Sequence, residues 1–322
     1  MSAPAGGANS IRVVISALVG NLAIAISKFV AAYITQSAGT LAEAVHSLAD
    51  TGNQILLLLG MRLSAGKPTE QHPFGRASEK YFWPFVVAIL LFSVGGAFAI
   101  YEGMHKLHEV TQGIVSHGGS HIWSYAVLGA SAAFESYSFM VARGEFKKTQ
   151  QGRSMVQTML QAKDPTIPVV VLEDMAALIG LLIALIGLGL SDLTGWQGWD
   201  GIASLIIGVL LCCVAVFLGR ETHSLLVGES ATSEERLKAR EIVEGVPGVE
   251  RVTQLLTMHL GPEEVLLAIK VAFPRGMVVE KVEDIIDELE TRVRKELPNM
   301  RYIFVEPDAK YEVHHDERGV PR

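Results

Sequence analysis

The sequence predicts a membrane bundle of six transmembrane helices over residues 11–230, followed by a small α+β domain of the ferredoxin-like αββαβ class over residues 231–309. Hydrophobic residues make up 49% of the 322 residues and charged residues only 19%, whereas soluble domains carry about 25% charged residues. The apolar excess lies before Ser230, and the remainder has the composition of a soluble domain. Residues 1–10 and 310–322 are expected to be polar tails.

Six segments are long and apolar enough to cross the hydrocarbon core of a bilayer, which takes roughly 20 residues of helix. None shows the alternation of apolar and polar residues that is typical of membrane β-strands. The first is too long for the core of a signal peptide, so we expect it to be retained as a helix. The predicted spans are Ile11–Ile34, Gly39–Leu63, Tyr81–Met104, Ile122–Ala142, Ile167–Leu190 and Gly201–Gly219.

Basic residues predict the orientation of the bundle. Lys and Arg gather between the second and third helices and between the fourth and fifth, and the short links after the first and fifth helices contain none. Because basic loops stay on the cytoplasmic side, we expect both termini there. The sequence begins without a recognisable transit peptide, so the expected location is a bacterial inner membrane.

The region after Ser230 reads as α-β-β-α-β. Thr232 or Ser233 caps a first helix, and Arg251–Leu260 and Val265–Phe273 are rich in the β-branched and aliphatic residues of strands. A third strand is expected at Arg301–Val305. Apolar residues at helical spacing predict a second helix that packs on the sheet; they are Val282, Ile285, Ile286, Leu289, Val293 and Leu297.

The second predicted span carries a polar stripe. Glu43, His46, Asp50, Asn53 and Gln54 are spaced by 3, 4, 3 and 4 residues, so they share one face of a helix. An imidazole and a carboxylate at i and i+4 can both bind one ion, and this mixed ligation suits zinc, manganese, iron(II) or cobalt better than calcium or magnesium. The alternative is that the pair only forms hydrogen bonds inside the bundle.

The fifth predicted span contains two adjacent carboxylates, Glu173 and Asp174. Adjacent helical residues point about 100° apart, so one carboxylate can bind an ion while the other pairs elsewhere. The alternative is that the two acids mark the wet end of a shorter helix. Ionisable residues inside a span are costly, and Lys28 and Glu135 are further examples that we expect to be structural.

Several function classes find no support. The net charge of −7 gives no reason to expect a nucleic-acid partner. The sequence shows no nucleophile–base constellation, no phosphate-binding loop and no HExxH pattern, so we expect no enzymatic activity and no resident cofactor.

The sequence resembles the cation diffusion facilitator family of zinc and related metal transporters. The resemblance runs from about Ile11 to Asp308 and is carried by several motifs together. It is most like the branch that contains zinc transporter nine and its bacterial relatives. The motifs are Ser37-Ala-Gly-Thr-Leu-Ala-Glu-Ala-Val-His-Ser-Leu-Ala-Asp50, His72-Pro-Phe-Gly75 with Glu79, Leu172-Glu-Asp-Met-Ala-Ala-Leu178, Asp200-Gly-Ile-Ala-Ser204 and Phe304-Val-Glu-Pro307.

The resemblance implies proton-coupled antiport of zinc or a similar ion by a homodimer that alternates between inward-facing and outward-facing states. It also implies a tetrahedral site with two ligands from the second helix and two from the fifth. His46 and Asp50 match the first pair and Asp174 the last position, but the remaining ligand falls at Val170, which cannot coordinate. The site then has three protein ligands and a water, or Glu173 or another polar group substitutes.

Two hypotheses follow for the function. In the first, metal and protons compete for His46 and the carboxylates, because histidine titrates near neutral pH, and a proton gradient drives metal out of the cytoplasm by alternating access. In the second, the chain is a membrane regulator or metal-sensing scaffold that no longer transports. The missing ligand at Val170 favours this second hypothesis.

Overall fold

The computed structural model describes residues 5–35, 38–113, 121–150, 152 and 154–308. Within these ranges the side chains of residues 5–9, 31–32, 34–35, 38–46, 49, 92, 121, 123 and 149 are outside the description. The predicted tail at 310–322 and residues 1–4 of the other predicted tail also lie outside it. The chain divides into two compact units, Met1–His223 and Ser224–Arg322.

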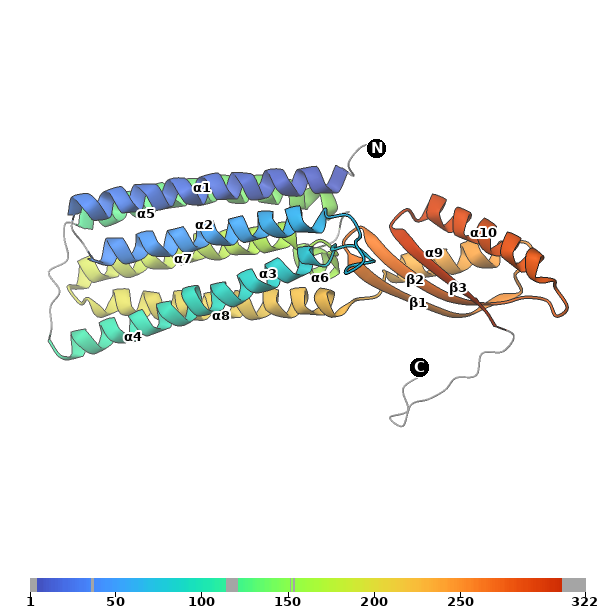
Figure 1. Cartoon of the computed structure of the whole chain (residues 1–322). Coiled ribbons are helices and arrows are strands. Elements are labelled where there is room, and N and C mark those ends of the chain that lie inside the picture. Colours follow the sequence, from blue (N-terminus) through green and yellow to red (C-terminus); the bar gives the residue numbers. More distant parts are fainter. Residues whose placement is uncertain (1–4, 36–37, 114–120, 151, 153, 309–322) are drawn as a thin grey trace. The chain divides into compact units, whose positions relative to one another are not determined.

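The larger unit is built from long helices that lie side by side (Figure 1). The third long segment is continuous and contains a π-helical stretch, η1, between α3 and α4. The elements are α1 (Ala5–Thr35), α2 (Ala38–Ser64), α3 (Glu79–Leu90), η1 (Leu91–Ala97), α4 (Phe98–Thr111), α5 (His121–Thr149), α6 (Met155–Gln161), α7 (Thr166–Thr194) and α8 (Gly198–Val227).

Four stretches of the described residues are long and apolar enough to cross a membrane. They are Ser10–Val30, Glu79–Thr111, Thr166–Thr194 and Gly198–Val227. α2 and α5 have comparable lengths of 27 and 29 residues, but they are not among the four: part of α2 is outside the description, and α5 carries serines, glutamates and lysines. The chain is therefore a multi-pass membrane protein with four candidate spans in its described part.

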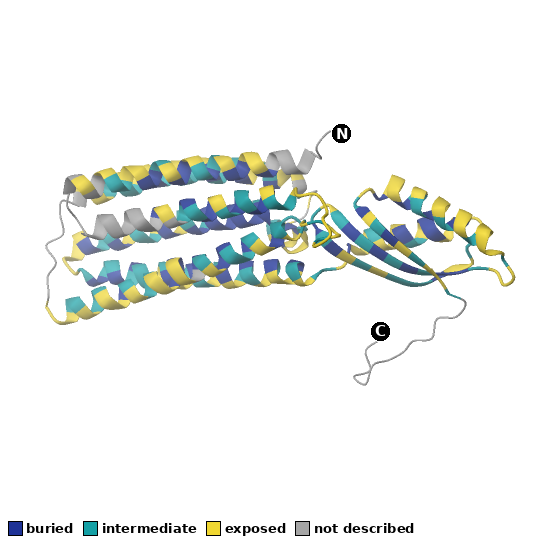
Figure 2. Cartoon of the chain, viewed as in Figure 1, coloured by how far each residue is buried: buried dark blue, intermediate teal, exposed yellow. Residues whose placement is uncertain are grey.

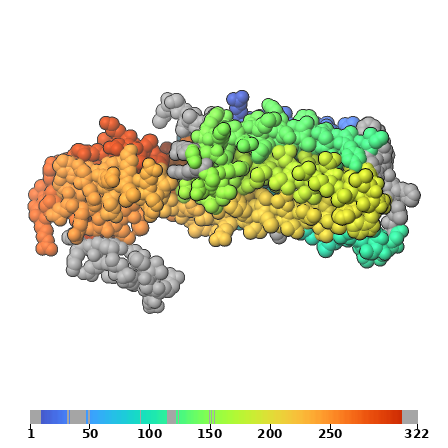
Figure 3. All heavy atoms as spheres, turned by 180° about the vertical axis from the view of Figure 1, so that it is seen from behind, coloured from blue at the N-terminus to red at the C-terminus, as the bar shows by residue number. Residues whose placement is uncertain are grey.

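The helices of this unit turn buried faces toward one another (Figure 2), and the residues of the core between them are hydrophobic. α1 packs against both α2 and α5, and α5 lies beside α7, as the view from behind also shows (Figure 3). Val14, Leu57, Val87 and Val169 are almost completely buried in the shared core. This core brings the polar residues of α2, α5 and α7 into one interior.

Two features of the helices differ from the sequence-based expectation. α1 begins at Ala5 instead of Ile11, because no helix-breaking proline lies between Pro4 and Ile11 and the helix extends past its apolar part. A short helix, α6, lies between the fourth and fifth predicted spans. It starts with a capping box in which Ser154 and Gln157 satisfy each other's backbone N–H groups.

The smaller unit has the expected order of elements: α9 (Ser233–Glu244), β1 (Arg251–Gly261), β2 (Glu264–Ala272), α10 (Val279–Glu296) and β3 (Met300–Pro307). The strands form one sheet in the order β1-β2-β3, antiparallel between β1 and β2 and parallel between β2 and β3. Alternate residues of β2, among them Val265, Leu267 and Ile269, are buried in a core shared with α9 and α10.

The opposite face of this sheet carries exposed apolar side chains. Leu256 of β1 pairs with Ala268 of β2, which pairs in turn with Phe304 of β3. Leu256 is 56% exposed and Phe304 is 54% exposed. In the neighbouring row, Met258 is also exposed. This surface, called the open sheet face below, is therefore apolar and uncovered within the unit.

Candidate metal site between α2, α5 and α7

α2 presents Asp50 to a cavity. Asp50 is half-buried, and the cavity has a volume of ≈370 Å³ with walls from α2 and from the end of α3 and η1. Leu91, Val94 and Gly95 line the η1 side. π-helical turns occur frequently at functional sites, and this one forms part of the wall of the cavity that Asp50 lines. An ion at this cavity would therefore have direct access to Asp50.

His46 lies one turn before Asp50 in α2. Its backbone is helical, so the expected i, i+4 spacing is present. The side chain of His46 lies outside the described residues, and so does that of Glu43. The predicted role of His46 as a ligand stays a prediction.

α7 buries both of its adjacent carboxylates. Glu173 is 8% exposed and Asp174 is 1% exposed, and both follow a fully buried run of valines. The two side chains diverge as adjacent helical residues must. Glu173 contacts α2, and Asp174 contacts α5. They do not sit at the exposed end of the helix, so the alternative of a wet helix end is wrong.

Glu173 joins α7 to α2 through both of its oxygens. Asn53 Nδ2 donates to Glu173 Oε1 at 3.0 Å, and Gln54 Nε2 donates to Glu173 Oε2 at 3.0 Å. All three side chains are buried. A buried carboxylate is tolerated when such hydrogen bonds replace its hydration. Glu173 therefore cross-links two helices. Its partners Asn53 and Gln54 precede it in the sequence by 120 and 119 residues.

Asp174 is held from α5. Ser138 Oγ donates to Asp174 Oδ2 at 2.7 Å, and both residues are buried. The hydrogen bond engages Oδ2 of Asp174 and orients the carboxylate, which leaves Oδ1 available to a bound cation. Ser138 was not singled out in the sequence, because α5 contains several serines and nothing in their spacing distinguishes this one.

The carboxylates of three helices act on one another. Asp50 interacts electrostatically with Glu173, with Asp174 and with Glu135 of α5. Lys28 of α1 acts on Glu135 with the opposite sign. Four acidic side chains thus face one basic side chain in a low-dielectric interior. A cation or protons that enter this interior reduce the repulsion between the carboxylates and so lower its electrostatic free energy.

The described side chains do not by themselves complete a metal site. Among them, no group of three or more His, Cys, Asp or Glu residues is arranged to hold a metal ion, and the side chain of His46 is not one of the described side chains. Val170, one turn before Asp174, is fully buried in the apolar core. α7 therefore offers no side-chain ligand at this position.

Comparison with known families places both units. The sequence model of the cation efflux transmembrane domain matches residues 14–227, and that of the cytoplasmic domain of cation efflux proteins matches residues 231–309. Together they cover both compact units of the chain.

Individual relatives agree with these matches. The chain is 34% identical over 256 residues to the mitochondrial proton-coupled zinc antiporter SLC30A9 of Xenopus laevis, covering 79% of this chain and 45% of that protein. It is 30% identical over 274 residues to metal tolerance protein C4 of Arabidopsis thaliana, covering 84% and 59%. The chain thus spans about half the length of these relatives.

A bacterial relative matches along nearly its whole length. The manganese efflux system protein MneP of Bacillus subtilis is 21% identical over 304 residues, covering 94% of this chain and 96% of that protein. The relatives therefore include proteins named for two different metals.

Proposed function

The chain belongs to the cation efflux family, also called the cation diffusion facilitators, and on that premise we propose that it exports a divalent metal ion from the cytoplasm in exchange for protons. Its family is one of transporters, not of enzymes. The observation that carries the proposal is that Asp50, which lines a cavity, interacts electrostatically with the buried Asp174 on a different helix.

The proposed site has three protein ligands: His46 and Asp50 from α2, and Asp174 from α7. A water completes the tetrahedron in place of the ligand that Val170 does not supply. Ser138 orients Asp174. Nitrogen and oxygen ligands in this number favour zinc, with manganese, iron(II) and cobalt as further candidates.

Glu173 has a different part in this proposal. Its oxygens accept hydrogen bonds from Asn53 and Gln54, so it holds α2 and α7 at the separation that the ligands need. In the competing assignment Glu173 is the fourth ligand, and its oxygens would bind the metal through lone pairs that Asn53 and Gln54 leave unused. Glu173→Gln separates the two assignments, because the ligand role predicts weaker metal binding in a folded protein, whereas the cross-link role predicts a less stable bundle.

Proton coupling follows from the competition between metal and protons. Histidine exchanges its proton near neutral pH, and metal binding requires deprotonated ligands. Loading from the cytoplasmic side then releases protons, and protonation from the other side releases the metal. We propose that α2 and α5 cross the membrane together with the four candidate spans. Six crossings put both termini on one side, and the basic loops favour the cytoplasm as that side.

The smaller unit is proposed to be a ferredoxin-like domain that joins two copies of the chain. Its αββαβ order and single sheet support that class. The open sheet face supplies an apolar surface of the kind that homodimer interfaces bury. The proposed location is the bacterial inner membrane, and a bacterial protein, MneP, is among the relatives that match along nearly their whole length.

A panel of transport assays tests the proposal. Purified protein in proteoliposomes is supplied with zinc, manganese, iron(II) or cobalt at several imposed pH gradients. Uptake of at least one metal that rises with an opposing proton gradient is expected. Metal uptake that does not change with the proton gradient would support metal transport but contradict proton-coupled antiport. The absence of flux for every metal would favour the regulator or scaffold hypothesis, which Val170 supports.

A further inference from the structure

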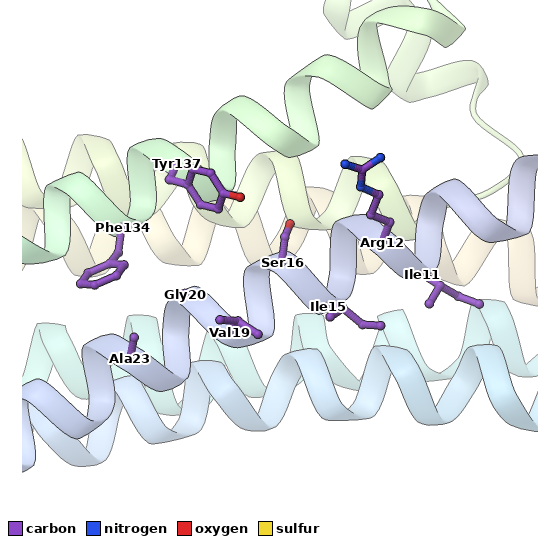
Figure 4. Close-up of a pocket in the computed structure, with 9 residues that line it drawn as sticks. All are labelled: Ile11, Arg12, Ile15, Ser16, Val19, Gly20, Ala23, Phe134 and Tyr137. Atoms are coloured by element: carbon purple, nitrogen blue, oxygen red, sulfur yellow. The ribbon is translucent and has the colours of Figure 1, made fainter.

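A groove runs between α1 and α5 on the outside of the helical unit. Its volume is ≈540 Å³. From α5, Phe134 and Tyr137 face α1, and from α1, Arg12 and Ser16 point toward α5 (Figure 4). The rest of the lining comes from α1 and is apolar or small: Ile11, Ile15, Val19, Gly20 and Ala23.

The groove is open to whatever surrounds the bundle. Val19 is 62% exposed, Tyr137 is 57% exposed and Ile15 is 46% exposed. A Cβ atom added at Gly20 would have no atom within 4 Å. The space is therefore an open groove on the surface of the bundle and not an internal packing defect. In a membrane-spanning domain an apolar surface of this kind faces lipid chains or another protein.

One end of the groove is cationic. Arg12 is the third residue of the candidate span Ser10–Val30, so it lies near the boundary of the membrane. Within the described part of the chain its guanidinium makes no ion pair or hydrogen bond. None of the lining residues is acidic. An arginine placed this way is suited to a phosphate, which it can bind through two parallel hydrogen bonds.

The same end carries more positive charge from α5. α1 and α5 run in opposite directions (Figure 1), so the last turns of α5 lie at the end where α1 begins. Arg143 and Lys147 are exposed there, while Lys148 is paired with Glu145. The excess of positive charge favours a ligand with net negative charge over a zwitterionic one.

We propose that this groove binds an anionic phospholipid, with the phosphate at Arg12 and one acyl chain along Ile15, Val19 and Phe134. A lipid satisfies both halves of the groove at once, because it brings an anion to the cationic end and a hydrocarbon chain to the apolar part. If two copies of the chain met groove to groove, Arg12 would stay without an acidic partner, because the lining of the groove contains no carboxylate.

Native mass spectrometry tests the assignment. The full chain is released from nanodiscs that contain equal amounts of phosphatidylglycerol and phosphatidylcholine, and the retained lipids are counted. Arg12→Gln removes the charge, and Gly20→Leu places a side chain in the groove from a Cβ that has no atom within 4 Å. Matched controls are Arg62→Gln, in the last turn of α2, and Gly129→Leu on α5, where an added Cβ also has open space. Thermal unfolding checks that all four variants fold.

The wild-type protein is expected to retain phosphatidylglycerol in preference to phosphatidylcholine. Arg12→Gln should lower that preference roughly fivefold, the factor for one lost basic attraction at a membrane surface. Gly20→Leu should abolish retention of both lipids, while the two controls behave as wild type. Unchanged lipid retention in both groove variants would overturn the proposal. Loss of the dimer in Gly20→Leu with lipid retention unchanged would also overturn it, since a second copy would then occupy the groove.

Discussion

Ser138 is the residue on which the orientation of Asp174 depends. Its hydroxyl donates a hydrogen bond to Asp174 Oδ2, and hydrogen bonds of this kind orient a carboxylate toward a metal. Ser138→Ala is expected to weaken metal binding roughly 10- to 100-fold and to lower transport at limiting metal while the fold persists. Isothermal titration with zinc measures the change.

Ser136→Ala is the matched control for this prediction. Ser136 lies two residues away on α5, is half-buried, and forms no hydrogen bond within the described part of the chain. It should bind zinc as the wild-type protein does. Equal affinity in Ser138→Ala and Ser136→Ala would show that Asp174 needs no partner on α5, or that it is not a ligand.

Glu235 makes the start of α9 sensitive to pH. Burial alone would raise the pKa of Glu235, but hydrogen bonds from Thr232 and Asn299 outweigh it and lower the pKa below its ordinary value. A lowered folded-state pKa means that the ionised group stabilises the fold above its unfolded pKa, and that this stability is lost as the pH falls through the folded pKa.

Glu235→Gln should therefore destabilise α9 by about 1 kcal/mol at neutral pH, and the difference from wild type should vanish below about pH 4. Hydrogen exchange of the α9 amides in the full chain, corrected for intrinsic rates, measures this difference in the stability of α9. Glu234→Gln, in the same first turn, is the control. A difference that is constant from pH 7 to pH 3 would contradict the assigned role of the charge.

At the scale of elements, α4 and α8 approach each other through glycines. A Cβ at Gly103 would lie 2.7 Å from the carbonyl oxygen of Gly201 and 2.8 Å from the backbone nitrogen of Leu205. One at Gly208 would lie 2.8 Å from the nitrogen of Ile100. Backbone atoms cannot move aside cheaply, and small residues at membrane helix crossings permit such close packing.

Gly103→Ala is expected to destabilise the bundle by roughly 1–3 kcal/mol, since it overpacks this crossing. Gly129→Ala, on α5 with open space around its Cβ, should be neutral or slightly stabilising because alanine favours helix. Thermal unfolding in detergent compares the two. A Gly103→Ala protein as stable as Gly129→Ala would mean that the helices cross at a greater distance.

The sequence predicts elements better than it predicts their partners. Hydropathy and helical periodicity predicted the helical segments and the αββαβ order, because these patterns are local. The hydrogen bonds from Asn53 and Gln54 to Glu173 join residues far apart in the chain, and no local pattern could identify them. The π-helical turn of η1 was also missed, since residues 91–97 read as ordinary apolar helix.

At the scale of the whole molecule, the open sheet face is the proposed contact between two cytoplasmic units. Leu256→Glu would place a charge in the middle of that face, opposite Ala268, and burying an unpaired charge is costly. We expect the dimer of the full chain to weaken at least roughly tenfold, measured by light scattering in detergent. Leu237→Glu, at a site on α9 that is 62% exposed, should leave it intact. Equal dimerisation of both variants would show that the open sheet face is not part of the dimer interface.

The central claim is that Asp50 and Asp174 together bind the transported ion. Zinc uptake into proteoliposomes is to be measured for the wild-type protein, for Asp50→Asn and Asp174→Asn, and for Asp192→Asn, an exposed residue of α7, as control. Each asparagine keeps the size of the side chain and removes its charge. Both site variants are expected to fold but to transport no more zinc than protein-free liposomes, while the control transports as wild type. Undiminished zinc flux in either site variant would contradict it.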